Sequence, residues 1–330
     1  MKAGIIGFGI GEQHIYGYKK AGIDVVAICD KDKSKRLEAK EKFPNCEIFE
    51  HDYEILDLRN IDIISIASYD QDHAHQVIKA IDSGKHVFCE KPLCMNESEL
   101  KSIKNSLDKN PHVHLSTNTI LRMSQRFRDI KKRIKRNELG EIYCIEGDYN
   151  YGRLNKITQG WRSRVIDYSV VLGGGIHMID LLLWLVGSTV EEVSAFGNNI
   201  CSKSSSFKYL DMVTSLIRFK NGAVGKISAN FGCVYPHFHK VTVYGTKGTF
   251  ENRIDGALII NSRDINKSPN LLNSEYPGLK KGDLIPSFVN SITTKSEAEV
   301  SKTDVFDVMS ICLAINKSLK NKKTESVKYI

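Results

Sequence analysis

The feature that most constrains the fold is a regular alternation of short apolar runs and helix-forming segments over residues 1–117. The apolar runs occupy residues 2–8, 24–30, 46–50, 61–68, 85–90 and 112–117. The segments between them have helical patterns at residues 11–20, 33–43, 72–84 and 96–107, with Asn96 as the expected N-cap of the last one. Strands that alternate with helices of this length are typical of a parallel, doubly wound sheet. We therefore predict an N-terminal α/β domain.

The second half of the chain has many strand-like segments and few helices. The strand-like segments occupy residues 139–152, 191–199, 211–232, 239–251 and 256–262, and helices are expected at 175–187 and 304–319. Because so few helices separate the strands, a mostly antiparallel sheet with one open face is expected. A chain of 330 residues is long enough for two domains. We predict a domain of residues 1–119 and an α+β domain of residues 120–330.

Three glycines, Gly7, Gly9 and Gly11, lie between the first predicted strand and the first predicted helix. The dinucleotide-binding pattern G-x-G-x-x-G would place its third glycine at position 12, which is Glu12. Either Gly11 takes the packing role of the third glycine one residue early, or the turn is one residue shorter. In both cases the strand–glycine–helix context predicts that the first helix presents its amides to a pyrophosphate.

An acidic residue, Asp30, stands at the end of the second predicted strand, about 20 residues after the glycines. A carboxylate at this position accepts hydrogen bonds from the ribose hydroxyls and repels a 2′-phosphate. Lys31 and Lys33 follow it and would favour such a phosphate. The balance favours NAD over NADP, and residues 1–119 are predicted to form a dinucleotide-binding Rossmann domain.

The formal net charge of +8 raises the question of an anionic partner. The densest basic run, residues 126–136, places Phe127, Ile130 and Ile134 on one face, which is typical of an amphipathic helix with a solvated basic side. No nucleic-acid-binding motif accompanies it. The positive charge suits anionic small molecules, such as phosphorylated or uronic sugars, equally well. We expect no nucleic-acid partner.

Nothing in the chain indicates a membrane or a metal. The apolar stretch at residues 179–187 contains Asp180 and is too short to cross a bilayer, and the N-terminus carries no signal-peptide pattern. The eight cysteines form no C-x-x-C pair and no zinc-binding pattern with histidine. We expect reduced thiols, a cytoplasmic location and no metal site.

Residues 61–96 combine an apolar strand, His73 and the tripeptide Glu90-Lys91-Pro92. This arrangement resembles the Gfo/Idh/MocA oxidoreductases, named for glucose–fructose oxidoreductase and inositol dehydrogenase. In that family the strand commonly ends in Thr-Pro, and here Ser68 and Tyr69 replace the pair. The resemblance continues through residues 138–143, 173–185 and 243–251, so it covers nearly the whole chain.

Two residues are candidates for the chemistry. Lys91 follows a buried strand at the carboxyl edge of the sheet, where ligands bind in open α/β folds, and its ammonium can stabilise a developing oxyanion. The family resemblance implies that the bond from Lys91 to Pro92 is often cis. The resemblance also implies that His177, which follows three glycines, is the acid/base for the substrate hydroxyl.

The sequence departs from the family pattern four residues before His177. The family commonly reads D-x-G-x-H, whereas this chain has Gly173 where the aspartate is expected. The proton relay then rests on Lys91 and His177 alone, or on a replacement such as Tyr151, Asp167 or Tyr168.

Other positions are candidate ligand contacts. Asn118 and Arg122 follow the last strand of the first domain, and Arg122 suits either a substrate anion or a structural salt bridge. Asp180 is interpreted as a helix-packing or supporting carboxylate. The predicted cofactor-binding residues are Gly7, Gly9, Ile10, Gly11, His14, Asp30, Lys31, Ser68, Tyr69, His73, Glu90 and Lys91. The predicted substrate-binding residues are Asn118, Arg122, Tyr151, Trp161, Arg162 and His177.

The resemblance implies an NAD(P)-dependent dehydrogenase that moves a hydride between nicotinamide and a secondary alcohol of a sugar, cyclitol or nucleotide sugar. Two alternatives stay open: an NAD-dependent glycosidase of the same superfamily, and a non-catalytic NAD-binding regulator. The expected partner is a small sugar-like molecule. A homodimer or homotetramer that associates through the C-terminal sheet is also expected.

Overall fold

The computed structural model describes all 330 residues and divides into two compact units. Unit 1 comprises Met1–Ile120, Leu279–Met309 and Ile330, and unit 2 comprises Leu121–Gly278 and Ser310–Tyr329. The chain thus leaves unit 1 next to the predicted boundary at residues 119–120, and it returns to that unit over residues 279–309. None of the helices has the length and apolarity that a membrane span requires.

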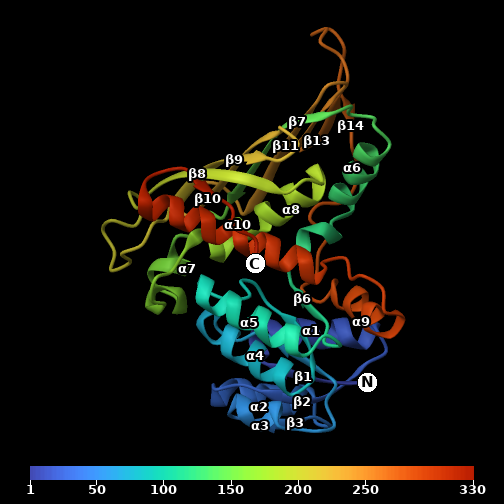
Figure 1. The fold of residues 1–330 in the computed structure, drawn as a ribbon, viewed down its shortest axis with the longest axis vertical. Coiled ribbons are helices and arrows are strands. Elements are labelled where there is room, and N and C mark those ends of the chain that lie inside the picture. The colour runs from blue at the N-terminus through green and yellow to red at the C-terminus, as the bar shows by residue number, and fades with distance from the viewer. The chain divides into compact units, whose positions relative to one another are not determined.

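Unit 1 is built on a six-stranded parallel sheet with the order β3-β2-β1-β4-β5-β6 (Figure 1). Its strands are β1 (Lys2–Ile6), β2 (Asp24–Cys29), β3 (Glu47–Phe49), β4 (Ile63–Ile66), β5 (His86–Cys89) and β6 (Leu115–Thr117). Its helices are α1 (Phe8–Lys20), α2 (Lys33–Lys42), α3 (Asp52–Leu56), α4 (His73–Asp82), α5 (Glu97–Lys109) and, from the returning segment, α9 (Ile285–Thr294). The strand order reverses between β1 and β4, and ligands of such sheets bind outside the carboxyl ends of the strands at this reversal.

The centre of this sheet is covered on both faces. All four residues of β4 are completely buried, which confirms the reading of residues 61–68 as a strand sandwiched between helices. The predicted N-cap of α5 is also present, since the Asn96 side chain accepts a hydrogen bond of 2.9 Å from the backbone amide of Glu99.

Unit 1 differs from the sequence prediction in its helices. Helix α1 begins at Phe8, three residues before the predicted start, so Gly9 belongs to the helix and Gly7 is its N-cap. Helix α3 was not predicted, because a helix of five residues is too short to show helical periodicity in the sequence. Helix α9 was not predicted because it is rich in Ser, Thr, Val and Asn, which have low helix propensities.

Unit 2 contains a nine-stranded mixed sheet with the order β14-β13-β12-β11-β7-β10-β9-β8-β15. Its strands are β7 (Ile142–Asn150), β8 (Val190–Asn198), β9 (Met212–Phe219), β10 (Val224–Asn230), β11 (Phe238–Gly245), β12 (Thr249–Arg253), β13 (Gly256–Ile260), β14 (Asn270–Leu271) and β15 (Glu325–Ser326). Neighbouring strands are antiparallel except β7 and β10, which are parallel. Asn221-Gly222, a dipeptide typical of tight hairpin turns, joins β9 to β10, and Gly222 adopts a positive φ of 89°.

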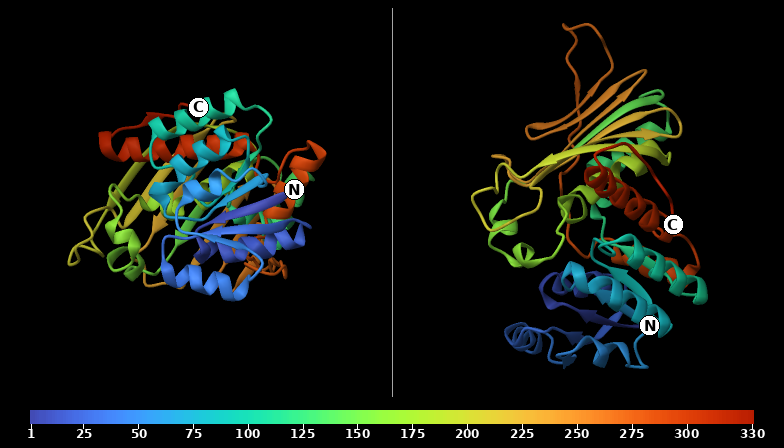
Figure 2. Two further views of the ribbon diagram at one scale, coloured as in Figure 1. Left: turned by 90° about the horizontal axis from the view of Figure 1, so that it is seen from below. Right: turned by 60° about the vertical axis from the view of Figure 1, so that its left-hand side comes forward.

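Helices cover one face of this sheet and leave the other open (Figure 2). The helices are α6 (Gln125–Lys135), α7 (Asn155–Thr158), α8 (Ile176–Val186) and α10 (Lys302–Asn321), which starts in unit 1 and ends in unit 2. Met178 and Leu182 of α8 lie against the middle of β7. The open face exposes large apolar side chains, including Phe196, Leu216 and Val224.

Candidate active site

The glycine turn between β1 and α1 has the shape that a dinucleotide requires. Gly7 has a φ of 89°, and a β-carbon there would overlap the Ala67 carbonyl. A β-carbon at Gly11 would lie 2.5 Å from Cγ2 of Ile5, so Gly11 takes the helix-packing role of the missing third glycine. At Gly9 no atom would lie within 4 Å of a β-carbon. The backbone of the first turn of α1 is therefore open to a pyrophosphate.

Asp30 is fixed next to this turn. One carboxylate oxygen accepts a hydrogen bond from the Phe8 amide and the other from the Asp32 amide, each at 2.8 Å. Each oxygen can accept a further hydrogen bond, as a ribose diol requires. Lys31 forms an ion pair with Asp72 at 2.9 Å, and this hydrogen bond raises the pKa of Lys31. The donor set and the open turn fit NAD.

Three further predicted cofactor residues lie at the carboxyl edge of the sheet. Ile10, in the first turn of α1, is 42% exposed, and Tyr69, after β4, is 48% exposed. The Ser68 hydroxyl donates a hydrogen bond of 2.6 Å to Gln76 Oε1.

A buried polar network lies beneath this edge. His14 is completely buried and lies with Nδ1 at 2.8 Å from Ser65 Oγ and Nε2 at 3.3 Å from Glu90 Oε1. Asn118 Nδ2 donates to Glu90 Oε1 at 2.6 Å and to the carbonyl of Lys281 at 2.8 Å. His14 and Asn118, both predicted as ligand contacts, each contact the Glu90 carboxylate in this structure.

Glu90 is held as an anion next to Lys91. Its burial alone would raise the pKa of Glu90, but the charge of Lys281, the His14 contact and Lys91 outweigh burial and lower that pKa well below its usual range. The charge of Lys91 is among those that lower the Glu90 pKa, so the ammonium and the carboxylate lie within electrostatic range of each other.

His73 also acts on the Lys91 loop. Its ring is completely buried, and Nδ1 donates a hydrogen bond of 2.6 Å to the carbonyl of Pro92, which follows a cis peptide bond from Lys91. Its Nε2 lies 3.2 Å from the carbonyl of Ser68. Both ring nitrogens of His73 thus face backbone carbonyls, and the histidine links the end of β4 to the loop after Lys91.

In unit 2, His177 lies in a cluster of aromatic rings. It is 5% exposed in the first turn of α8, and its ring stacks on Tyr149 with a centroid distance of 6.0 Å and an interplanar angle of 22°. Tyr149 in turn stacks on Tyr151 at 5.7 Å and 17°. The other rings within 6.5 Å of these three are Phe231, His237 and His239.

The structure accounts for the missing aspartate at Gly173. A β-carbon at this position would overlap the Tyr168 hydroxyl and come within 2.9 Å of Tyr168 Cζ. Tyr168 is 4% exposed, and Val171–Gly175 form a π-helical turn directly before α8. Such turns are common at functional sites. Of the three replacements considered from the sequence, the Tyr168 hydroxyl occupies the space in which the aspartate side chain would begin.

Arg122 and Asp180 form a buried ion pair. The guanidinium donates to both carboxylate oxygens at distances of 2.7–3.1 Å, and the side chains are 3% and 1% exposed. This bidentate geometry is the structural salt bridge that the sequence left open as an alternative to substrate binding by Arg122. Asp180 is the supporting carboxylate that was expected.

The remaining candidates lie on the segment after β7. The Arg162 guanidinium lies 4.4 Å above the ring of Trp161, and both side chains are half-buried. Asp167 is exposed, with a φ of 56°, and its amide donates a hydrogen bond of 2.8 Å to the Tyr209 hydroxyl. The structure therefore favours Tyr168 over Asp167 as the group nearest to Gly173.

A second histidine site, on β11, was not predicted from the sequence. His239 Nδ1 lies 2.7 Å from the Tyr276 hydroxyl, which also accepts a hydrogen bond of 3.1 Å from the His239 amide. The phenol oxygen is thus an acceptor for the amide, and it lies within hydrogen-bond distance of the imidazole of the same residue. The alternating histidines of "PHFHK", with His237 just before β11 and His239 within it, were the signal for this site.

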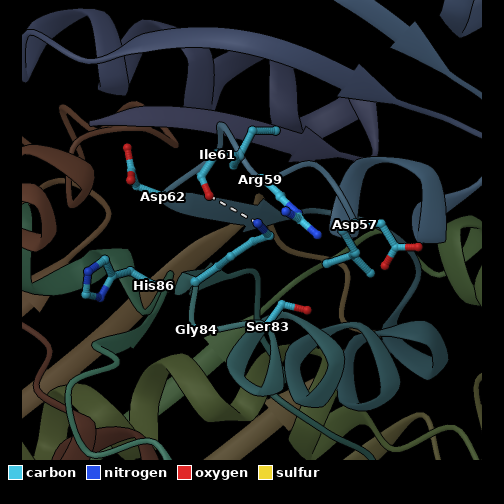
Figure 3. Close-up of a pocket in the computed structure, with 9 residues that line it drawn as sticks. Asp57, Arg59, Ile61, Asp62, Ser83, Gly84 and His86 are labelled. Atoms are coloured by element: carbon cyan, nitrogen blue, oxygen red, sulfur yellow. Dashed lines mark hydrogen bonds between the residues drawn. The ribbon is translucent and has the colours of Figure 1, made fainter.

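A cavity of about 570 Å³ lies at the opposite edge of the parallel sheet, at the amino ends of β4 and β5 (Figure 3). Its lining includes Asp57, Arg59, Asp62 and His86, and the Lys85 ammonium donates to the carbonyls of Leu58 and Ile61 at 2.6 and 3.2 Å. Because ligands of doubly wound sheets bind at the carboxyl ends of the strands, this cavity is not the candidate cofactor site.

The parallel sheet, the open glycine turn and the acid at the end of β2 define an NAD-binding oxidoreductase with a Rossmann unit. Two family models agree: residues 1–118 match the oxidoreductase family with an NAD-binding Rossmann fold, and residues 127–251 match the GFO/IDH/MocA C-terminal domain. The chain belongs to the Gfo/Idh/MocA family of enzymes.

Known proteins extend this comparison. Myo-inositol 2-dehydrogenase of Thermotoga maritima is 25% identical over 98% of both chains. The scyllo-inositol 2-dehydrogenase (NAD(+)) of Bacillus subtilis is 26% identical over 61% of this chain and 57% of its own.

Solved structures share the fold. A levoglucosan dehydrogenase in complex with NADH and L-sorbose has a TM-score of 0.86 at 22% identity, with 100% of this chain and 99% of that chain covered. The WlbA dehydrogenase of Bordetella pertussis, in complex with NADH and UDP-GlcNAcA, has a TM-score of 0.83 at 21% identity, with the same coverage.

Proposed function

We propose that this protein is an NAD-dependent dehydrogenase that oxidises a secondary alcohol of a sugar, cyclitol or nucleotide sugar, or reduces the corresponding ketone. The observation that carries the proposal is Lys91, held next to an ionised, buried Glu90 at the carboxyl edge of a dinucleotide-binding sheet. The inositol and levoglucosan dehydrogenases among its relatives support the substrate class.

Bound NAD supplies the hydride acceptor at C4 of its nicotinamide. The amides of the first turn of α1 and the Asp30 carboxylate hold the pyrophosphate and the ribose. The Lys91 ammonium donates a hydrogen bond to the reacting hydroxyl oxygen and stabilises the negative charge that develops there. The buried Glu90 carboxylate lies within electrostatic range of Lys91, and His73 holds the loop that carries the lysine.

His177 accepts the hydroxyl proton on its imidazole during oxidation and returns it during reduction. Stacking on Tyr149 fixes the plane of the His177 ring. We infer that the Tyr168 hydroxyl replaces the family aspartate, because position 173, against which it packs, lies four residues before His177. A tyrosine hydroxyl both donates and accepts a hydrogen bond, so it can pass a proton, although it carries no charge with which to stabilise an imidazolium.

The test is turnover with a panel of cyclitols, sugars and nucleotide sugars, followed by NADH absorbance. We expect substrate-dependent NADH formation that falls in Lys91→Ala and His177→Ala while NADH binding persists. Cleavage of aryl glycosides without net NADH formation would identify the NAD-dependent glycosidase instead. Tight NADH binding without turnover of any panel member would identify the regulator.

We also propose that two or four copies associate through the open face of the nine-stranded sheet. The exposed apolar side chains of Phe196, Leu216 and Val224 support this association. A monomer rarely leaves a cluster of large apolar side chains exposed to solvent on one face of a sheet. Eight free thiols support a reducing, cytoplasmic location.

A further inference from the structure

Two rings and a guanidinium follow one another outward from His177. The His177 ring stacks on Tyr149, Tyr149 stacks on Tyr151, and the Arg153 guanidinium lies 5.4 Å above the ring of Tyr151. Tyr149 is nearly buried, Tyr151 is half-buried and Arg153 is exposed. The series therefore leads from the proposed acid/base to a solvent-accessible cation.

A second arginine, Arg162, lies within electrostatic range of Tyr149. Burial is the main cause of the raised pKa of Tyr149, but the charges of Arg162 and Arg153 lower it in part, so both cations lie within electrostatic range of this phenol. Arg162 itself lies over Trp161.

No acidic group neutralises these two arginines. Neither Arg153 nor Arg162 forms an ion pair or a hydrogen bond with a carboxylate, whereas Arg122 of the same unit is bidentate on Asp180. Asp148 is close in sequence, but it belongs to the opposite face of β7 and pairs with Lys226 at 2.9 Å. Two cations without carboxylate partners beside aromatic rings favour an anionic ligand.

We propose that Arg153 and Arg162 bind an anionic group of the substrate, a phosphate or a carboxylate, while Tyr149 and Tyr151 contact the part of the molecule between this group and the reacting carbon. The proposal rests on the proposed dehydrogenase function and narrows its substrate class to anionic sugars, such as sugar phosphates, uronates or nucleotide sugars. A guanidinium is suited to this task because its planar donors match phosphate and carboxylate oxygens in pairs. Two rings separate the arginine from His177, so the anion lies at a distance from the carbon that is oxidised.

The experiment is calorimetric titration of the NAD-loaded protein with myo-inositol, glucose, glucuronate, glucose 6-phosphate and UDP-glucuronate. We expect at least one anionic sugar to bind, and its Kd to rise about tenfold or more in Arg153→Ala and in Arg162→Ala, as loss of a charge-assisted hydrogen bond implies. Arg164→Ala is the matched control, because Arg164 is an exposed cation of the same segment with no contact to these rings. The Kd for NADH should be unchanged in all three variants.

The choice of titrated sugars identifies which type of anionic group the arginines bind. Binding of glucuronate identifies a carboxylate, binding of glucose 6-phosphate a monophosphate, and binding of UDP-glucuronate alone a nucleotide diphosphate, and any of these supports the proposal. Tighter binding of myo-inositol or glucose than of every anionic sugar would overturn it. An unchanged Kd of the preferred anion in the Arg153→Ala/Arg162→Ala double variant would overturn it as well.

The same titrations distinguish this inference from the proposed function. If an anionic sugar binds through the arginines but no member of the panel produces NADH, the dehydrogenase function fails and the anion site stands. If a neutral cyclitol is oxidised and anionic sugars do not bind, the function stands and the anion site fails.

Discussion

The contact between Tyr168 and Gly173 permits a quantitative prediction. In Gly173→Ala the new methyl group would overlap the Tyr168 hydroxyl and lie 2.9 Å from Cζ, closer than carbon atoms approach in folded proteins. Tyr168 is 4% exposed and also packs against Phe207 and Phe231 at centroid distances of 5.9 and 6.4 Å, so its ring has little room to move. Overpacking of this kind costs about 1–3 kcal/mol.

The assay is thermal unfolding of the wild-type protein, Gly173→Ala, Tyr168→Phe and the double variant. Gly173→Ala should lower Tm by roughly 2–4 °C for each kcal/mol lost, as expected for a unit of this size. Tyr168→Phe removes the hydroxyl that the methyl group would overlap. The loss in the double variant should therefore be smaller than the sum of the two single losses by about 0.5 kcal/mol or more.

If the stability loss of the double variant equals the sum of the two single losses, the placement of Tyr168 against position 173 is refuted. A Gly173→Ala variant as stable as the wild type would refute it as well. Activity gives the second readout. If the Tyr168 hydroxyl replaces the family aspartate, Tyr168→Phe should lower kcat about tenfold or more without changing the Kd for NADH. A Tyr168→Phe variant with normal kcat would assign the residue a packing role alone.

Three further predictions concern the cofactor, pH and association. Asp30→Ala should raise the Kd for NADH about tenfold or more and reduce the preference for NADH over NADPH, as measured by fluorescence titration. An unchanged preference would show that Asp30 does not bind the ribose. Burial and the neighbouring His114 and His112 lower the pKa of His86 to about 4, so the unfolded chain binds more protons than the folded one between pH 4 and about 6.5. The stability to urea should therefore fall as pH decreases through this range, and His86→Gln should flatten the slope; an equal slope in the variant would contradict this assignment. Leu216 is 57% exposed on the open face of the nine-stranded sheet. Leu216→Asp should shift the protein to monomers in light scattering and leave the Tm of diluted protein nearly unchanged. An unaltered mass in this variant would exclude this face as the interface.

Much of unit 1 could be predicted from the sequence, because its signals are local. Apolar runs that alternate with helical segments gave all six parallel strands, and the position of Asp30 after β2 indicated the cofactor. The start of α1 was predicted three residues late, since glycines are ordinarily read as a loop. Gly9 and Gly11 lie within the helix here because one faces open space and the other packs on Ile5.

The buried polar groups could not be assigned from the sequence. His14, His73 and Arg122 are types that often bind ligands, and only the tertiary structure shows that their partners are Glu90, the Pro92 carbonyl and Asp180. These partners lie 19 to 76 residues away along the chain, beyond the reach of a local pattern.

The parallel pairing of β10 with β7 was also beyond local patterns. Each strand shows the alternation of a half-buried strand, and that alternation is the same for parallel and antiparallel neighbours. The pairing depends on where the long connection through α8 returns the chain to the sheet.

We propose that Lys91 and His177 carry the proton chemistry of this NAD-dependent dehydrogenase. The most direct measurement is single-turnover NADH formation by the wild-type protein, Lys91→Ala and His177→Ala, each saturated with NAD and with the preferred sugar. We expect each variant to bind NADH with the wild-type Kd and to form NADH at least about 100-fold more slowly. NADH formation at the wild-type rate in either variant would contradict it.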